Sequence, residues 1–507
     1  MSDADLVLGI DLGTSAVKAA LFDAQGAVHA TARAAYETRF PAPGHAEQDP
    51  HDWWHALGTT VRELASAVEG GAHRIKGLGI AAQMCGGVAV DAAGEPLHPC
   101  LIWLDTRSAG IAREITSGTI RIEGYGLLRL LGWLRLANGA PNLDGRDTLS
   151  KLLWLKRHLG GAPARYLDVK DWLLLKLTGR AATTPDVAQL TWLMDNRVGR
   201  RDWSDGYLDR FGLTRAMLPE IVECAAVAGA LTSEAAAHLG LREGLPVAGG
   251  ASDLNAAALA AGDQREGAYH FCLGTSSWWG AHSKRRHVSP TTGIATMCAA
   301  HRDRYLLVAA QESAGAAVRW AASTFGFEDE RAIDAAAAEA CPGADTPTFV
   351  PWLYGERVPV SVREGRGGLA GASLRTDRRD IAYAVLAGVA FNARWAYECA
   401  RRCVAASTAV VRVTGGGATS AVWRQVLADV VGVPLQAVEA PAYAGARGAA
   451  MTAATACGWY ASLDEAATMA RYADTAQPDP ARRAWADERY HRYLALARRI
   501  ARDANND

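Results

Sequence analysis

A short motif occurs twice in this chain, about half the chain length apart. The residues Leu12-Gly13-Thr14-Ser15 return as Leu273-Gly274-Thr275-Ser276. Each copy separates two apolar runs that are typical of β-strands. These runs are 6–10 and 17–22 around the first copy, and 269–272 and 278–281 around the second. The repeat therefore predicts two similar halves, each built around a β-hairpin with Gly-Thr-Ser in its turn.

The chemistry of this turn indicates a phosphate ligand. Glycine allows a tight turn and a close approach of the backbone to a ligand, and successive amides that point the same way form an anion-binding nest. Thr14, Ser15, Thr275 and Ser276 add hydroxyl groups. Two such hairpins predict two halves that hold one polyphosphate between them, which is typical of a nucleotide-using enzyme.

Length, charge and cysteine content narrow the class of protein. At 507 residues the chain exceeds what one hydrophobic core usually supports, so at least two domains are expected. The formal net charge of −1 argues against nucleic acid or an anionic membrane as partner. Nine cysteines without a Cys-x-x-Cys pair and the acidic start Met1–Asp5 predict a cytoplasmic protein with reduced thiols. The apolar run 381–391 is shorter than the roughly 18–20 residues of a membrane span.

Hydrophobic periodicity predicts alternating strands and helices, so the expected fold class is α/β. After the first hairpin we expect a third strand, then a helix with Asp49 as N-cap and Pro50 as its first residue. A further strand and two more helices follow. The third strand is expected at 28–36 and the further strand at 77–81. The two helices are expected at 149–158 and 166–177.

A glycine-rich loop, Gly249–Asp253, marks the expected junction between domains 1–254 and 255–507. Its last residue, Asp253, has two interpretations. A carboxylate between two domains can take a proton from a substrate hydroxyl, and an aspartate in front of a helix near Asn255 can also serve as N-cap. The two tasks are compatible with each other.

A strand–glycine–helix unit follows in the second half, with strand 410–414 leading into Gly415-Gly416-Gly417-Ala418. Backbone can approach a ligand closely there, and a helix N-terminus attracts negative charge. The unit also matches a loose dinucleotide fingerprint, with Ser420 in the third glycine position and Glu439 at the end of the next strand. An NAD-linked oxidoreductase is therefore an alternative.

Asp11 comes directly before the first Gly-Thr-Ser turn, at the end of a strand. A carboxylate there can hold Mg²⁺, directly or through water, and the alternative is an aspartate that only stabilises the hairpin turn. No lysine follows a glycine, which excludes a Walker phosphate loop. His51 and His55 have the spacing of a zinc-binding helix, but no third ligand is evident, so a surface helix is favoured.

Taken together, these residues resemble the FGGY family of carbohydrate kinases, in the superfamily of actin, sugar kinases and Hsp70, and most of all its xylulokinase-like members. The resemblance runs over nearly the whole chain, as a series of motifs in the same order. The matching segments are 9–15, Glu47-Gln48-Asp49-Pro50, 79–84, Trp103-Leu104-Asp105-Thr106-Arg107, 249–253, 273–276, Gly355-Glu356-Arg357 and 415–418.

The resemblance implies two ribonuclease-H-like domains with ATP, Mg²⁺ and a sugar in the cleft between them. Asp253 would be the general base that deprotonates the sugar hydroxyl, and Asp11 would serve the metal. The nucleotide would be bound by Gly13, Thr14, Ser15, Gly274, Thr275, Ser276, Gly415, Gly416, Gly417 and Ala418. The sugar would be bound by Gln83, Met84, Cys85, Trp103, Asp105 and Asn255.

Two residues depart from the xylulokinase pattern. Cys85 stands where xylulokinases carry histidine, and Leu254 stands where they carry asparagine directly after the catalytic aspartate. A site that hydrogen-bonds hydroxyl groups discriminates strongly by those contacts, so the sugar can differ while the reaction is kept. We expect ATP- and Mg²⁺-dependent phosphorylation of a small ketose such as xylulose, or of a related polyol.

Two other function classes lead to different expectations. A non-catalytic ATP-binding switch of the same fold would bind ATP without sugar-stimulated turnover, and an NAD-linked oxidoreductase would bind NAD near Gly415–Ala418. Asp253 and the sugar-site motifs favour the kinase. We expect no nucleic-acid or membrane partner, and a homodimer is the assembly to be tested.

Overall fold

The structure is a computed structural model that describes residues 4–159, 163–289, 291–362 and 365–506. The chain forms two compact units. The first comprises Met1–Gly262, Met297–Tyr305 and Tyr443–Arg471, and the second comprises Asp263–Thr296, Leu306–Ala442 and Tyr472–Asp507. The units are therefore not consecutive halves, because a late segment of the chain joins the first unit. The expected junction after residue 254 falls inside helix α10 (Asp253–Ala260).

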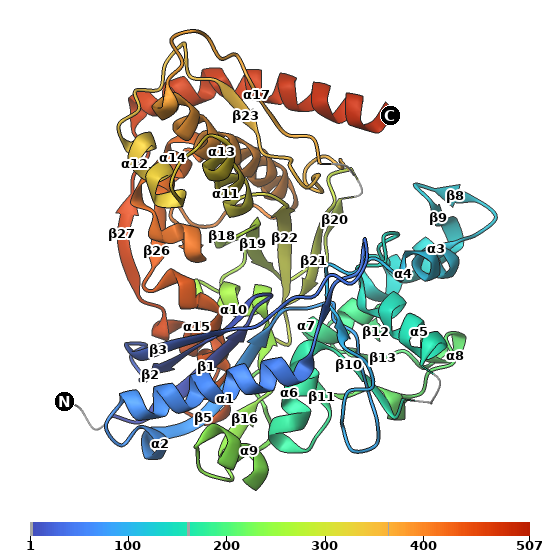
Figure 1. The fold of residues 1–507 in the computed structure, drawn as a ribbon. Coiled ribbons are helices and arrows are strands. Elements are labelled where there is room, and N and C mark those ends of the chain that lie inside the picture. The colour runs from blue at the N-terminus through green and yellow to red at the C-terminus, as the bar shows by residue number, and fades with distance from the viewer. Residues whose placement is uncertain (1–3, 160–162, 290, 363–364, 507) are drawn as a thin grey trace. The chain divides into compact units, whose positions relative to one another are not determined.

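A mixed sheet forms the centre of the first unit (Figure 1). Its strand order is β15-β16-β5-β1-β2-β3, and β17 also pairs with β5. β1 and β16 run parallel to β5, whereas β2 is antiparallel to β1 and to β3, and β15 is antiparallel to β16. The strands are β1 (Leu6–Leu12), β2 (Ala16–Phe22), β3 (Val28–Ala35), β5 (Ile75–Ala82), β15 (Val227–Ala230), β16 (Pro246–Ala248) and β17 (Ala251–Ser252).

Side chains along β1 alternate between the two faces of this sheet, and helices cover both faces. Leu6, Leu8, Ile10 and Leu12 pack in one core cluster with helix α1 (Pro50–Ala67). Val7 packs in another cluster with α10 and with the alanine-rich helix α15 (Ala444–Ala456). Successive side chains of a strand point to opposite faces, so Asp11 lies on the α15 side. In Figure 1, α1 and α15 flank the sheet on opposite sides.

The sheet of the second unit repeats this arrangement. Its order is β20-β21-β22-β19-β18-β25-β26-β27. Along the series β19-β18-β25-β26-β27 the four pairings are antiparallel, parallel, parallel and antiparallel. The series β2-β1-β5-β16-β15 of the first sheet has the same four pairings in the same order. The strands are β18 (Tyr269–Leu273), β19 (Ser277–Ser283), β20 (Val288–Ser289), β21 (Ile294–Cys298), β22 (Tyr305–Gln311), β25 (Val411–Thr414), β26 (Leu435–Val438) and β27 (Tyr472–Ala476). The predicted α/β fold of two similar domains is confirmed.

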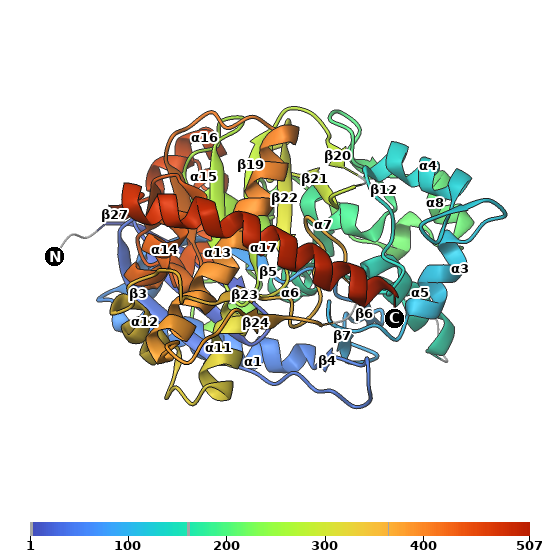
Figure 2. The same cartoon turned by 90° about the horizontal axis from the view of Figure 1, so that it is seen from above.

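Three helices near the end of the chain pack in the core of the second unit. They are α13 (Arg378–Cys403), α14 (Ala421–Val431) and α17 (Pro480–Asn506). Figure 2 shows α17 crossing over α13, and the buried side chains of Tyr490 and Tyr493 join α17 to the core cluster of this unit. None of the described helices has an apolar stretch long enough to cross a bilayer.

Local sequence signals place the start of α1 correctly but place the start of α6 (Val169–Thr178) too early. α1 begins at Pro50, and the carboxylate of Asp49 accepts a hydrogen bond of 2.9 Å from the backbone N–H of His51, as predicted. The helix expected from residue 166 instead begins at Val169, because Tyr166 lies in β10 (Arg165–Leu167). This strand pairs with β6 (Val88–Val90), and Asp168 then caps helix α6 (Val169–Thr178).

A glycine-to-alanine substitution at the contact between α10 and α15 tests this packing. A Cβ atom added to Gly448 would overlap the carbonyl oxygen of Ala256, so the two backbones would have to separate. We expect Gly448→Ala to lower the free energy of unfolding by about 1–3 kcal/mol, measured by urea denaturation. The matched control is Gly110→Ala in α3 (Ala109–Thr116), where the added Cβ has no atom within 4 Å. The control should keep or slightly raise stability, and equal stability of both variants would contradict the packing described.

Candidate functional site

Strand register brings three predicted segments to one edge of the first sheet. Ala82 of β5 lies between Leu12 of β1 and Ser252 of β17, and both neighbours run parallel to β5. The residues that follow these three strand ends are Gly13, Gln83 and Asp253. Segments far apart in the sequence therefore place a phosphate-type turn, an amide and a carboxylate next to one another.

Asp253 is the first residue of α10 and is half-buried. The interpretation of Asp253 as N-cap is wrong, because Ser252 caps the helix by accepting a 3.3 Å hydrogen bond from the N–H of Asn255. Among the residues that the structure describes, the carboxylate of Asp253 accepts only the N–H of Leu254, at 2.8 Å. Burial, and next the negative charge of Asp11, raise the pKa of Asp253 to about 7. A carboxylate with that pKa can exchange protons near neutral pH.

Asp11 lies against the first turn of α15 within the first unit. A Cβ atom on Gly445 would overlap its carboxylate, so only glycine permits this approach. A helix N-terminus stabilises a nearby negative charge. Burial nevertheless raises the pKa of Asp11 to about 6, with Lys18 acting in the opposite direction. The sequence did not connect Gly445 to the site, since glycine also occurs at helix starts that bind no ligand.

The first Gly-Thr-Ser hairpin is held from outside by side chains. The Gln48 amide donates to the Thr14 carbonyl at 2.6 Å, and the indole N–H of Trp103 donates to the Thr14 hydroxyl at 3.0 Å. The hydroxyl of Tyr36 donates to the Gly13 carbonyl. Among the described residues, the backbone N–H groups of Thr14 and Ser15 meet no protein acceptor. The turn thus keeps donors for an anion.

Gln83 carries an unused hydrogen-bond acceptor. Its side-chain nitrogen donates to the Gln48 oxygen at 2.7 Å, and the same oxygen accepts the Trp53 indole N–H at 3.0 Å. The Gln83 side-chain oxygen is buried and has no partner among the described residues. A buried acceptor without a partner is unfavourable, so this oxygen is available to a ligand hydroxyl. Gln48 belonged to a recognised motif, but its role in fixing Gln83 is visible only in three dimensions.

The loop after Gln83 turns sharply at Cys85, whose φ is 61°. The buried ammonium group of Lys151 donates to the Cys85 carbonyl at 2.6 Å, and the carboxylate of Asp168 accepts the N–H of Gly86 at 2.9 Å. Met84 and Cys85 are both half-buried. Burial raises the pKa of the Cys85 thiol to about 12, so it acts as a neutral contact and not as a nucleophile.

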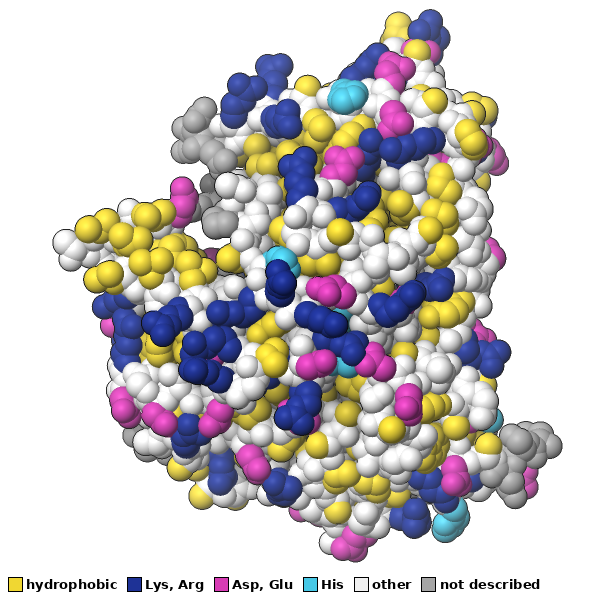
Figure 3. All heavy atoms as spheres, turned by 180° about the vertical axis from the view of Figure 1, so that it is seen from behind, with side chains coloured by type: hydrophobic (Ala, Val, Ile, Leu, Met, Phe, Trp, Pro, Cys, Tyr) yellow, Lys and Arg dark blue, Asp and Glu magenta, His cyan; other side chains and the backbone are white. Residues whose placement is uncertain are grey.

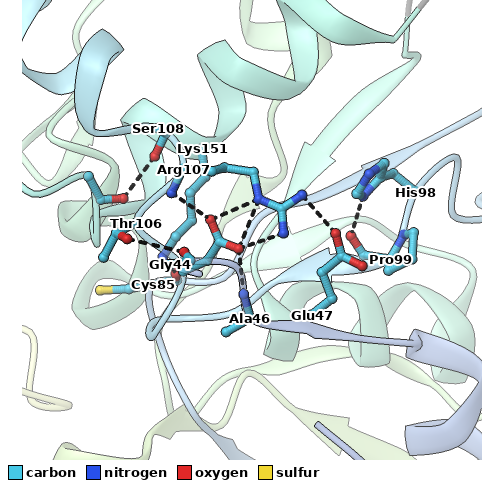
Figure 4. A network of polar contacts seen from close by, with 12 residues as sticks. Gly44, Ala46, Glu47, Cys85, His98, Pro99, Thr106, Arg107, Ser108 and Lys151 are labelled. Atoms are coloured by element: carbon cyan, nitrogen blue, oxygen red, sulfur yellow. Dashed lines mark hydrogen bonds and ion pairs between the residues drawn. The ribbon is translucent and has the colours of Figure 1, made fainter. Parts of the chain in front are cut away.

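The side chain of Asp105 is fully buried and belongs to the network around Ala46, Glu47 and Arg107 that Figure 4 shows. Its two carboxylate oxygens accept the N–H of Ala46 at 2.7 Å and a bidentate fork from Arg107, with the shortest contact at 2.7 Å. Arg107 also pairs with Glu47 at 2.7 Å. This geometry favours a positioning role for Asp105, because its oxygens are already occupied. The segment Trp103–Arg107 contacts the first Gly-Thr-Ser hairpin through the indole of Trp103.

Asn255 also has a structural arrangement of contacts. Its amide nitrogen donates to the Ser252 hydroxyl and to the Cys298 carbonyl, both at 3.1 Å, and its oxygen accepts the N–H of Ala300 at 2.8 Å. Both amide hydrogens are therefore used within the first unit. These contacts favour an anchoring role over the sugar contact expected from the sequence.

Two buried charged residues hold the loop in front of Asp253. Lys170 in α6 donates to the carbonyl of Gly249 at 2.8 Å. Asp186 in α7 (Pro185–Ala188) accepts the N–H of Ser252 at 2.7 Å. Its negative charge is also among the causes that raise the pKa of Asp253. Neither residue stood out in the sequence, because a single Lys or Asp in a helix is usually a surface group.

In the second unit, the second hairpin and the Gly415–Ala418 loop lie together. Cys272 of β18 pairs with Thr414 of β25, so both strands end side by side. Gly415 has a φ of 89°, and a Cβ there would overlap the Leu273 carbonyl oxygen. The predicted nucleotide residues of this half are thus neighbours at one sheet edge, and the close contact requires glycine.

Helix α11 (Gly315–Thr324) fixes the second hairpin. The N–H of Gly315 donates to the Gly274 carbonyl at 2.9 Å, and the N–H of Ala316 donates to the Thr275 carbonyl at 3.0 Å. The approach to this helix is held by Glu356, whose carboxylate accepts the N–H of Glu312 at 3.1 Å. Burial raises the pKa of Glu356 to about 8. The motif Gly355-Glu356-Arg357 therefore supports the second hairpin indirectly, because Glu356 fixes the segment that leads into α11.

The geometry around Gly415 differs from a dinucleotide fold. Ser420 is the N-cap of α14 and accepts the N–H of Trp423 at 3.0 Å, so the third glycine position is replaced by a capping hydroxyl. The strands β18, β25 and β26 run parallel to one another, but β19 pairs antiparallel with β18 and β27 pairs antiparallel with β26. A dinucleotide-binding sheet is mostly parallel.

Comparison with known proteins decides the family. Residues 6–260 match the N-terminal domain of the FGGY family of carbohydrate kinases, and residues 270–457 match its C-terminal domain. The chain belongs to this family. The kinase therefore transfers a phosphoryl group from ATP to a sugar hydroxyl, as predicted. Nothing in the comparisons supports the non-catalytic switch or the NAD-linked oxidoreductase.

Individual relatives agree with the family assignment. The kinase is 33% identical to a xylulose kinase of Klebsiella pneumoniae, over 85% of this chain and 86% of that protein. It is 30% identical to a xylulose kinase of Bacillus subtilis, over 91% and 90% of the two chains. A solved structure from Brucella ovis, titled a xyloylose kinase, has a TM-score of 0.85 and 30% identity and covers 97% of this chain and 98% of its own. Plasmodium falciparum glycerol kinase with ADP shares the fold, with a TM-score of 0.82 and 20% identity, covering 98% of both chains.

The loop-holding role of Asp186 and Lys170 leads to a kinetic prediction. Asp186→Asn weakens the hold on Ser252 and removes one negative charge facing Asp253, alongside those of Asp11 and Asp168. We expect kcat to fall about 10–100-fold from misplacement of the carboxylate, with a lower apparent pKa in the pH profile of kcat/KM.

Lys170→Met is the matched control for that pKa shift. It releases the Gly249 carbonyl without removing a negative charge, so it should lower kcat but should not lower the apparent pKa. Identical pH profiles for the wild-type enzyme and Asp186→Asn would contradict the electrostatic role of Asp186.

Proposed function

We propose that this kinase phosphorylates a hydroxyl group of a small ketose such as xylulose, or of a related polyol, with Mg-ATP as donor and Asp253 as general base. The observation that carries the proposal is the common edge of β1, β5 and β17, where Asp253, the unpartnered oxygen of Gln83 and the first Gly-Thr-Ser turn lie next to one another. A base for the acceptor alcohol, a contact for it and a phosphate turn are the three elements that phosphoryl transfer to a sugar requires.

Asp253 would act in its ionised form. A sugar hydroxyl hydrogen-bonded to this carboxylate loses its proton as the oxygen attacks the terminal phosphorus in line. The pKa of about 7 makes Asp253 a stronger base than an ordinary aspartate. Its place at the N-terminus of α10 fixes its direction, because Ser252 and Asp186 hold the preceding backbone.

The nucleotide-binding residues are proposed in two groups, each described within its own unit. Gly13, Thr14 and Ser15 would bind phosphate oxygens from the first unit. Gly274, Thr275 and Ser276 would do so from the second, with Gly415–Ala418 beside the adenosine. The glycine-dependent contacts at Gly415 and the helix α11 that holds Gly274 support this assignment. That both hairpins bind a single triphosphate stays a prediction.

The residues present fit a magnesium ion held mainly by the nucleotide. Among the described residues, no group of three or more His, Cys, Asp or Glu side chains is arranged to hold a metal. Mg²⁺ in kinases is usually bound by one or two carboxylates together with substrate phosphates. Asp11 offers one such carboxylate beside the phosphate turn, and its pKa of about 6 leaves it ionised at neutral pH. When bound, the ion would neutralise charge on the transferred phosphoryl group.

The sugar contacts are proposed from the Gln83–Cys85 loop. Gln83 would accept a substrate hydroxyl, and Met84 and Cys85 would shape the adjoining wall. Trp103 and Asp105 would support that wall through their contacts with Thr14 and Arg107. A cysteine offers less volume and weaker hydrogen bonding than histidine, so the wall at Cys85 favours a sugar that needs no strong partner there.

Two further properties are proposed on general grounds. Nine free cysteines suit a reducing cytoplasm. A homodimer is the assembly we would test by light scattering.

The general-base role predicts a mutational effect and a pH profile. A carboxylate base works only when deprotonated, so kcat/KM of the wild-type enzyme should fall tenfold per pH unit below about pH 7 and level off above it. Asp253→Asn should lower turnover by about 10²–10⁴-fold with ATP binding retained. Near-normal sugar-dependent ADP release by that variant would remove Asp253 from the mechanism.

The substrate class is tested by a coupled ADP-release assay. Pentuloses, hexuloses, tetritols, pentitols and small linear diketones form the panel, and we expect the highest kcat/KM with a ketose or polyol. Cys85→His should shift preference toward D-xylulose by roughly 10-fold or more, because it restores a polar partner. Cys457→Ala, which removes a thiol at the C-terminal end of α15, serves as control and should leave the preference unchanged. An unchanged ranking in Cys85→His would exclude Cys85 as a specificity determinant.

A further inference from the structure

The first unit contains a cavity of about 640 Å³ that shares no residue with the proposed active site. It lies between α3, α4 (Leu127–Ala137), α5 (Thr148–His158) and α8 (Asp205–Arg210). Its lining residues are Glu114, Ile115, Ser117, Arg129, Leu153, Lys156, Arg157, Arg210 and Phe211. Four of these residues are cations and one is an acid, although the chain as a whole carries a formal charge of only −1.

Two of the cations are fixed in place by backbone carbonyl groups. Arg129 donates to the carbonyls of Glu114 at 2.8 Å and Ile115 at 2.6 Å, near the end of α3. Lys156 donates to the carbonyl of Phe211 at 3.0 Å, just after α8. Carbonyl groups at helix ends carry only partial charge. Both side chains are thus oriented while their formal charges are not neutralised.

Arg210 is oriented by aromatic rings. Its guanidinium carbon lies 5.5 Å from the ring centroids of Trp133 and Phe211 and 6.0 Å from that of Tyr207. Among the residues that the structure describes, it has no hydrogen-bond or ion-pair partner. Burial, and next the charge of Arg129, lower the pKa of Arg210. Its donors are therefore available to an anion in the cavity.

Arg157 and Glu114, two residues of the lining, form an ion pair with each other. Two contacts of 2.8 Å join them, and both side chains are largely exposed. Such an exposed pair exchanges readily with solvent or with another partner. With this pair neutral, Arg129, Lys156 and Arg210 leave three positive charges around one cavity.

The surface around the cavity also combines cationic and apolar side chains. In Figure 3, Lys and Arg side chains gather beside an apolar projection of the first unit, and β8 (Arg121–Ile122), β9 (Tyr125–Gly126) and α4 lie at the corresponding edge of that unit in Figure 1. The exposed apolar residues of this segment are Ile120, Ile122, Leu128 and Leu131. Inside the cavity, Ile115, Leu153 and Phe211 supply apolar wall next to the cations.

We propose that this cavity binds a small multivalent anion that carries a phosphate group. Guanidinium groups match phosphate oxygens in planar, bidentate geometry, and a phosphate of two negative charges suits a lining with three unneutralised cations. The apolar wall fits a short carbon skeleton, so a phosphate ester uses more of the cavity than free phosphate does. The binding site is separate from the sugar and nucleotide residues and does not depend on which sugar is phosphorylated.

Calorimetric titration of the full chain tests the site. Inorganic phosphate, pyrophosphate and glycerol 2-phosphate are titrated at matched ionic strength, with Mg²⁺ and a saturating non-hydrolysable ATP analogue filling the donor site. We expect saturable binding that Arg210→Gln weakens by at least about tenfold. Arg33→Gln removes the same charge from exposed strand β3 and should leave the affinity unchanged. Tighter binding of the ester assigns an organic phosphate, and tighter binding of inorganic phosphate or pyrophosphate assigns the inorganic anion.

Two readouts separate failure of the site from failure of folding or of the kinase. Arg157→Gln, on the exposed rim, should also weaken binding and carries the test if Arg210→Gln does not fold. Sugar-dependent ADP release without added anion should be unchanged in both variants. Absence of saturable binding to the wild-type protein, or equal loss in Arg33→Gln, would overturn the proposal.

Discussion

Close packing of α15 against β1 and β5 is the constraint on which the first unit depends. Added Cβ atoms on Gly9 and Gly79 would overlap carbonyl oxygens of the helix, so the helix rests directly on the strand backbones. This contact brings the N-terminus of α15 to the end of β1, where Asp11 lies. A larger residue at Gly445 would separate the helix from that carboxylate. The same contact therefore supports both the core and the proposed metal position.

Electrostatics around the edge of this sheet follow from burial. The pKa values of Asp11 and Asp253 are raised because both carboxylates are partly removed from water, and the negative charge of Asp11 also raises the pKa of Asp253. Lys151 and Lys170 are buried and donate to the backbone carbonyls of Cys85 and Gly249, in two loops of the candidate site. Charged groups thus serve here as rigid donors to the backbone, which keeps the loops fixed while Asp253 retains an elevated pKa.

The two sheets share the same arrangement of strands around their Gly-Thr-Ser hairpins. In each unit a Gly-Thr-Ser hairpin joins the first two strands, and a third strand runs parallel beside the first. The groups that hold the hairpins differ. In the first unit side chains such as Gln48 bind the turn, whereas in the second the N-terminus of α11 binds the carbonyls of Gly274 and Thr275. The shared strand pattern with different supports is consistent with different tasks for the two turns.

The sequence by itself determined the α/β class, the paired hairpins, most helix starts and the segments that carry Asp11, Asp253 and the Gly415 loop, because these depend on local periodicity, turn residues and recognisable motifs. The tertiary structure decided which of those residues can meet a ligand. Asp105 and Asn255 share the motifs, yet their polar atoms are bound within the protein. Gln83 keeps a free acceptor because Gln48 occupies only its nitrogen. Whether a buried polar atom has a hydrogen-bond partner depends on residues distant in the chain. A local pattern of residues therefore cannot predict it.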